Sequence, residues 1–112
     1  MNEAYLVVID PDWIDCRVEI VGVADTPKGA LELAVACGPL DPRDHIAISR
    51  HIMGRSDRRH PAVQVSLDAE CRITRIAANR GVRGNDYGSE TLRNDLVGAL
   101  GHPVKTQGEW EE

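Results

Sequence analysis

The sequence predicts a single α+β domain, in which five strands form one mostly antiparallel sheet and two helices pack on it in the order ββαβββα. Short runs rich in Val and Ile alternate with two amphipathic stretches that begin at helix-capping residues. The chain also has no Phe among its 112 residues, so the core has to be built from Val, Ile, Leu and Ala. Such side chains suit a sheet covered by slender helices. The order of the strands within the sheet stays open.

The first two strands are expected at residues 4–9 and 17–24. The first is a nearly continuous apolar run, AYLVVI, which is typical of a strand with both faces covered. Asp10 and Pro11 are expected to end it by starting a turn. Because the two strands are close in sequence, an antiparallel hairpin is the economical pairing.

The first helix is expected directly after the second strand. Asp25 or Thr26 caps it, and Pro27 occupies its first position, where a missing N–H costs nothing. Its apolar stripe, spaced i, i+3, i+4 and i+7, consists of Ala30, Leu33, Ala34 and Cys37. Gly38 ends the helix. We expect the strand–helix unit at residues 18–38 to serve folding, with its apolar side chains accounted for by the core.

Three further strands are expected, at residues 45–53, 62–67 and 72–77. In the first of these, isoleucines alternate with small or polar residues, so one face is buried and the other is wet. Arg50 is the exception on the apolar face, where its guanidinium reaches past the core or lies near an edge. In the last strand, Ile73 and Ile76 are three residues apart, which predicts a bulge or an early end.

The second helix is expected after a glycine-rich loop at residues 79–88. Ser89 caps it, and Glu90 is well placed for the helix dipole. The single domain therefore spans residues 1–103, and the acidic residues 104–112 are expected to form a mobile tail.

Composition and cysteine usage favour a cytoplasmic protein. No apolar run approaches the roughly 20 residues of a membrane helix, and the N-terminus lacks the basic start of a signal peptide. The three cysteines, Cys16, Cys37 and Cys71, are far apart and odd in number, which argues against a disulfide framework or a zinc site. We expect no cofactor and no metal.

Charge is distributed unevenly along a chain whose net charge is −5. Residues 1–49 carry nine acidic and three basic side chains, whereas residues 50–83 carry eight arginines and three acidic side chains. Residues 84–112 are acidic again, with six acidic and two basic side chains. The arginine-rich segment predicts a basic surface for nucleic acid or an acidic protein. The alternative is that these arginines pair with the chain's own carboxylates.

Two charged clusters are candidate partner-binding sites. The acidic cluster consists of Asp10, Asp12, Trp13 and Asp15. An exposed Trp ringed by carboxylates is a good interface anchor, although Trp13 has the alternative of folding over the sheet edge as a lid on the core. The basic cluster consists of Arg55, Arg58 and Arg59.

A third candidate is an anion-binding site where the glycine-rich loop enters the second helix. It consists of Arg80, Arg83, Gly84 and Ser89. Backbone N–H groups at a helix N-terminus bind phosphate, but the loop lacks the Walker and dinucleotide-binding spacings. A connector that needs glycine for its turns is the alternative.

The leading hypothesis is a small protein-interaction module that acts as a regulator, adaptor or inhibitor of a larger protein through charged surface patches. The alternatives are a nucleic-acid-binding protein that uses residues 50–83, and a small enzyme with an anion site at residues 81–89. Binding is favoured over catalysis because no Ser/His/Asp or Cys/His motif is recognisable. Self-association through an exposed edge strand is also open.

Overall fold

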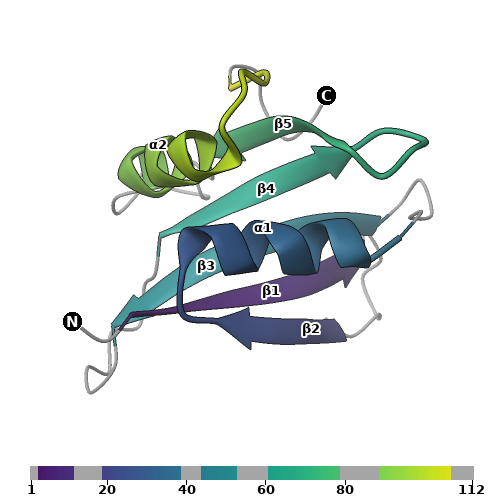
Figure 1. Ribbon diagram of the computed structural model, residues 1–112. Coiled ribbons are helices and arrows are strands. Elements are labelled where there is room, and N and C mark those ends of the chain that lie inside the picture. The colour runs from purple at the N-terminus through teal and green to yellow at the C-terminus, as the bar shows by residue number, and fades with distance from the viewer. Residues whose placement is uncertain (1–2, 12–18, 39–43, 53–60, 79–88, 107–112) are drawn as a thin grey trace.

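The computed structural model describes residues 3–11, 19–38, 44–52, 61–78 and 89–106. It confirms the predicted α+β fold, with five antiparallel strands in one sheet and two helices in the order ββαβββα (Figure 1). The elements are β1 (Glu3–Pro11), β2 (Glu19–Ala24), α1 (Pro27–Ala36), β3 (Asp44–Ile52), β4 (Ala62–Leu67), β5 (Ile73–Ala78) and α2 (Ser89–Leu100).

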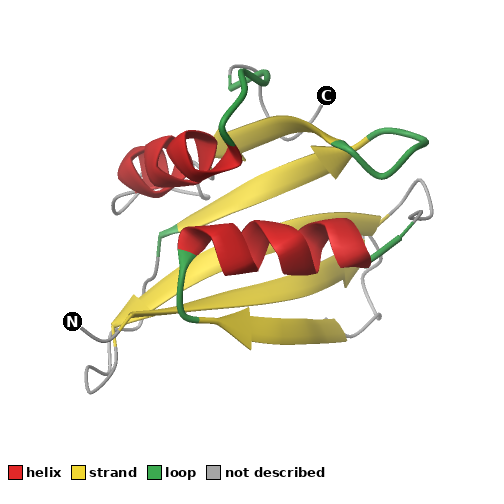
Figure 2. Cartoon of the chain, in the orientation of Figure 1, coloured by secondary structure: helices red, strands yellow, loops and turns green. Residues whose placement is uncertain are grey.

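The sheet has the strand order β2-β1-β3-β4-β5, and every neighbouring pair is antiparallel. Since β1 lies between β2 and β3, those two strands run in the same direction, and α1 connects them across β1. Both helices lie on one face of the sheet, as Figure 2 shows with helices in red and strands in yellow. The opposite face carries no described helix, and we call it the outer face.

The core fills the space between the sheet and the helices. Register brings β-branched residues together there, because Val7 of β1 lies opposite Ile48 of β3, and Ile46 lies opposite Val65 of β4. All four are buried. The helices add Ala30 and Ala34 from α1 and Leu92 and Leu96 from α2. The expected core of Val, Ile, Leu and Ala is present, and among the described residues Tyr5 is its aromatic member.

The start of α1 follows its local sequence. Thr26 is the N-cap, and its hydroxyl accepts a hydrogen bond from the N–H of Gly29 at 3.0 Å. Pro27 occupies the first helical position. After the helix, Gly38 has a φ of 76°, a left-handed conformation that glycine adopts without steric cost.

Several strand boundaries differ by one residue from the sequence prediction, and the end of β1 differs by two. β1 does not end at residue 9 but continues through Asp10 and Pro11, which pair with His45 and Asp44 of β3. The predicted turn at Asp10 was therefore wrong, because the backbone of Asp10 and Pro11 is part of the strand. A proline at the end of a strand is tolerated because the ladder loses a single N–H donor there.

The predicted bulge in β5 is confirmed. Ser66 pairs with Arg75 and Leu67 pairs with Ile73, so Thr74 is the extra residue. The bulge returns Ile73 to the same buried face as Ile76, despite their spacing of three.

The chain returns to the sheet after α2. Lys105 forms a parallel bridge with Arg75, in which the N–H of Ile76 donates to the carbonyl of Lys105 at 2.9 Å, and the N–H of Lys105 donates to the carbonyl of Thr74 at 3.1 Å. These residues belong to the tail expected from residue 104, whose remainder, 107–112, lies outside the described residues. Neither described helix is long and apolar enough to cross a membrane.

Candidate protein-interaction surface

Most of the candidate residues from the sequence lie outside the part of the chain that the structure describes. These are Asp12, Trp13, Asp15, Arg55, Arg58, Arg59, Arg80, Arg83 and Gly84. The backbone of Asp10 belongs to β1. The structure therefore tests neither the two charged clusters nor the anion-binding site, and all three stay predictions.

Ser89 is the member of the anion-binding candidate that the structure describes. It is the first residue of α2 and is buried, and its hydroxyl accepts a hydrogen bond from the N–H of Ala62 at 3.2 Å. This bond ties the start of α2 to the start of β4.

Two arginines of residues 50–83 pair with carboxylates of their own chain. Arg50 on β3 lies 2.8 Å from Asp95 on α2. Arg72, the last residue of the β4–β5 loop, lies 3.2 Å from Asp68 and 3.3 Å from Glu70. For these two residues, the alternative of internal pairing holds.

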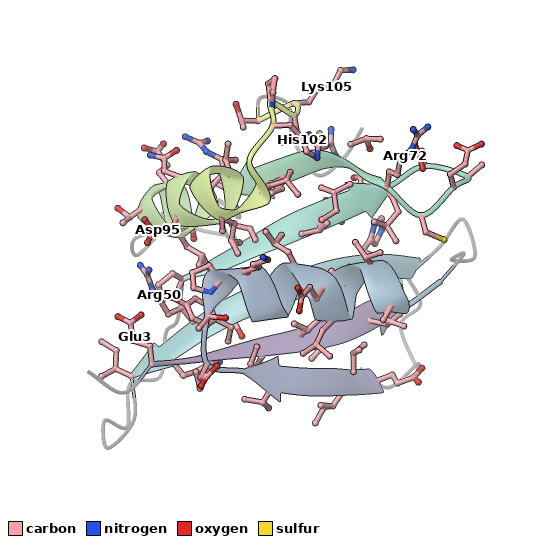
Figure 3. The ribbon with its side chains drawn as sticks, in the orientation of Figure 1. Glu3, Arg50, Arg72, Asp95, His102 and Lys105 are labelled. Carbon is pink, nitrogen blue, oxygen red and sulfur yellow. The ribbon has the colours of Figure 1, made fainter. Side chains whose placement is uncertain are left out.

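Arg50 belongs to a polar cluster at one end of the core, formed by Glu3 and Tyr5 of β1, Arg50 of β3 and Asp95 of α2. Figure 3 shows Glu3, Arg50 and Asp95 along the same side of the molecule. Burial lowers the pKa of Arg50, but hydrogen bonds with Asp95 and Tyr5 outweigh burial and raise this pKa above its ordinary value. The pKa of Tyr5 is raised by burial and by the hydrogen bond that its hydroxyl donates to Glu3 at 3.0 Å. The cluster places two carboxylates around one guanidinium, and its Arg50–Asp95 ion pair connects α2 to the sheet.

The outer face exposes aliphatic side chains at its β2 end. Leu6 of β1 lies opposite Val23 of β2, and Val8 lies opposite Ile20. These side chains alternate with the buried Tyr5 and point away from the helices. The side chains of Ile20 and Val23 remain 67% and 63% exposed, the two largest exposures among the described large hydrophobic residues.

The two ends of β2 are acidic. Glu19, the first residue of the strand, and Asp25, the residue after it, are both exposed. Across residues 19–38, all of which are described, three carboxylates accompany a single lysine. The β2 edge therefore presents an apolar centre between two negative ends.

Sequence reasoning missed this surface. It assigned the apolar residues of β2 to the core, whereas Ile20 and Val23 point outward. A bulge contributes, because Val7 pairs with Gly22 and Val8 pairs with Ile20, which leaves Val21 as the extra residue that packs against the core. The sequence signal was the lack of strict alternation in EIVGVA.

A serine–histidine pair also lies on the outer face. The hydroxyl of Ser49 and Nε2 of His51 are 2.8 Å apart on β3, close enough for a nucleophile and its base. Acyl transfer also needs N–H donors for the oxyanion, commonly including the N–H that follows the serine. Here that N–H belongs to Arg50 and donates to the carbonyl of Pro61 at 3.0 Å. Because that N–H is already used, we interpret the Ser49–His51 contact as a hydrogen bond between surface side chains.

Metal and thiol chemistry find no further support in the described part of the chain. No group of three or more His, Cys, Asp or Glu side chains is arranged there to hold a metal ion. Cys37 and Cys71 are free, and burial, reinforced by the negative charge of Glu19, raises the pKa of the Cys37 thiol.

Comparison of the chain with protein-family models, curated proteins and solved structures gave no match. Its function therefore has to be argued from the surface itself.

Proposed function

We propose that this chain is a small protein-interaction module that acts as a regulator, adaptor or inhibitor of a larger protein. The exposure of Ile20 and Val23 on the edge strand β2 carries the proposal. Natural sheets blunt their edges with charges, prolines, bulges or covering segments, because an open apolar edge pairs with other chains. The β2 edge has a bulge at Val21 and a charge at each end, yet Ile20 and Val23 stay exposed between them. Aliphatic side chains that stay exposed at an edge are therefore a reason to expect a partner.

The nucleic-acid alternative is weakened because two of the three described arginines in residues 50–83 pair with carboxylates. Arg50 and Arg72 both contact carboxylates, which cancels the charge that a phosphate backbone would neutralise. A sharp test is binding to duplex DNA and RNA across a salt series. Binding that falls steeply with salt and is lost on charge reversal of Arg55, Arg58 and Arg59 would support this alternative.

A cytoplasmic location belongs to the proposal. It rests on the odd number and wide spacing of the cysteines, which suit a reducing compartment.

Affinity capture with matched variants tests the interaction module. The bait is the full chain, compared with I20K/V23K on the β2 edge and with T91K/N94K, which adds the same charge at exposed positions of α2. We expect the unaltered chain and T91K/N94K to retain a captured protein that I20K/V23K loses.

Charge reversal of Asp12 and Asp15, and separately of Arg55, Arg58 and Arg59, completes the series. Loss of the captured protein in one of these variants would assign the contact to a charged cluster instead of β2, and the proposed interaction function would still hold. Capture that none of the variants alters would contradict the proposal.

A further inference from the structure

We infer that β2 is a strand-addition site that accepts an extended, basic segment of a partner protein as a sixth strand of the sheet. This inference rests on the proposed interaction function and names the chemistry of its partner. Strand addition obtains affinity from main-chain hydrogen bonds and specificity from alternate side chains.

The two edges of the sheet differ in what covers them. At the β5 edge, Lys105 accepts a hydrogen bond from the N–H of Ile76 and donates one to the carbonyl of Thr74. The other edge is β2, whose strand partner in the sheet is β1 alone. In the described part of the chain, no strand pairs with the outer side of β2. Within the described residues, β2 is therefore the edge whose outward backbone groups would pair with an added strand.

The side chains of β2 fit an aliphatic strand. Ile20 and Val23 are exposed on the outer face, next to Val8 and Leu6. A strand added beside β2 would lie roughly 4.8 Å away and place its own side chains against these two residues. Aliphatic or β-branched residues at alternate positions make the favourable cross-strand pairs there.

Charge decides between a foreign strand and a second copy of this chain. Antiparallel pairing of two β2 strands along their length would bring the Glu19 end of one copy beside the Asp25 end of the other. Both carboxylates are exposed, and like charges placed opposite each other destabilise a strand pair. A segment with Lys or Arg near its ends meets opposite charge at both positions, so the partner is basic.

The test uses synthetic peptides and the full chain. The probe is a capped peptide of alternating Lys and Val that matches the six residues of β2. The controls are the same peptide with N-methyl groups on alternate backbone nitrogens, which blocks the ladder and keeps the charge, and a peptide with Glu in place of Lys. Amide hydrogen exchange and NMR titration report where each peptide binds.

We expect the Lys–Val peptide to slow exchange at Glu19–Ala24 and to leave the central strand β3 unchanged. In I20K/V23K, the affinity should fall by about tenfold or more, whereas T91K/N94K should stay within about twofold. Neutralising the ends with E19Q/D25N should weaken binding by about threefold and flatten its salt dependence. The N-methylated and acidic peptides should not bind.

Four results would overturn the inference. The first three are no binding of the Lys–Val peptide, slowed amide exchange away from β2, and equal binding of the N-methylated peptide. The fourth is concentration-dependent self-association of the chain that I20K/V23K abolishes, because the occupant of β2 would then be a second copy. The interaction module stands independently of the peptide, because it falls only if affinity capture yields no protein that depends on β2 or on a charged cluster.

Discussion

Replacing Asp95 with alanine is expected to lower the free energy of unfolding by about 1–2 kcal/mol, because Arg50 then loses its carboxylate partner while its side chain stays largely buried. This ion pair joins the middle of the chain to α2, 45 positions later. It is therefore a direct measure of how firmly α2 is held to the sheet.

The magnitude follows from the geometry and the exposure of the pair. Nη1 of Arg50 lies 2.8 Å from Oδ2 of Asp95, a short charge-assisted contact. The side chain of Arg50 is 16% exposed and that of Asp95 is 47% exposed. An exposed pair contributes up to about 1 kcal/mol, and an unpaired buried polar group costs about 1–3 kcal/mol. Because Asp95 is half in water and Tyr5 still reaches the guanidinium, the lower part of that range applies.

A double-mutant cycle measured by urea unfolding tests this reasoning. R50M keeps most of the aliphatic packing and leaves Asp95 in water, so R50M and R50M/D95A should have nearly equal stability. The coupling energy should then equal the cost of D95A in the unaltered chain, about 1–2 kcal/mol. The matched control is R72M, which removes an arginine whose side chain is 74% exposed and should cost less than about 0.5 kcal/mol.

Two results would refute the reasoning. One is a coupling energy below about 0.3 kcal/mol, which is within the scatter of additive mutations. The other is a cost of R72M equal to that of D95A. Either result would mean that burial does not set the value of these ion pairs.

The remaining predictions concern the β4–β5 loop and the thiol of α1. Cys71 has a φ of 63°, a left-handed conformation that glycine adopts without steric cost. C71G should therefore raise the free energy of unfolding by about 0.5 kcal/mol, whereas C71A should not. Equal effects of the two substitutions in urea unfolding would contradict the explanation from backbone strain. The carboxylate of Asp68 accepts hydrogen bonds from the N–H groups of Arg72 and Glu70, led by that of Arg72, and these lower its pKa below the ordinary 3.8. The resulting stabilisation is present above pH 3.8 and is lost as the pH falls through the folded-state pKa. The difference in free energy of unfolding between the unaltered chain and D68N should therefore disappear on acidification. A difference that does not change with pH would exclude this linkage. Cys37 should react with iodoacetamide more slowly than an unhindered thiol at the same pH, because its raised pKa leaves less thiolate, and E19Q should speed the reaction. Mass spectrometry of the alkylated chain follows both rates, and an unchanged rate in E19Q would show that Glu19 does not act on the thiol.

Local signals in the sequence predicted most of the fold. Thr26 and Pro27 define the start of α1 because capping and the fixed φ of proline act within one turn. The spacing of Ile73 and Ile76 predicted the bulge because both side chains had to reach the same buried face. The predicted end of β1 was wrong because nine consecutive pairs with β3 outweigh the turn preference of Asp10 and Pro11.

The candidate surface depended on information that is not local. Whether Ile20 and Val23 are buried depends on the bulge in β2 and on which face of the sheet the helices cover. The partner of Arg50 lies 45 positions away, and no periodicity within β3 identifies it. Contacts between distant parts of the chain set both features. The sequence therefore indicated that Arg50 is a charged residue on an apolar face, but it did not indicate that Asp95 is its partner.

The bridge between Lys105 and β5 has a consequence for the order in which the protein is made. The hairpin of β1 and β2 with α1 ends at Ala36, so this unit can form early in synthesis. β5 ends at Ala78, but the residue that pairs with its free side is added only after α2 is complete. At roughly 5–20 residues per second, the β5 edge stays open for on the order of seconds. During that interval, the nascent sheet offers a second template for misdirected strand pairing, and Lys105 then covers its middle, from Thr74 to Ile76.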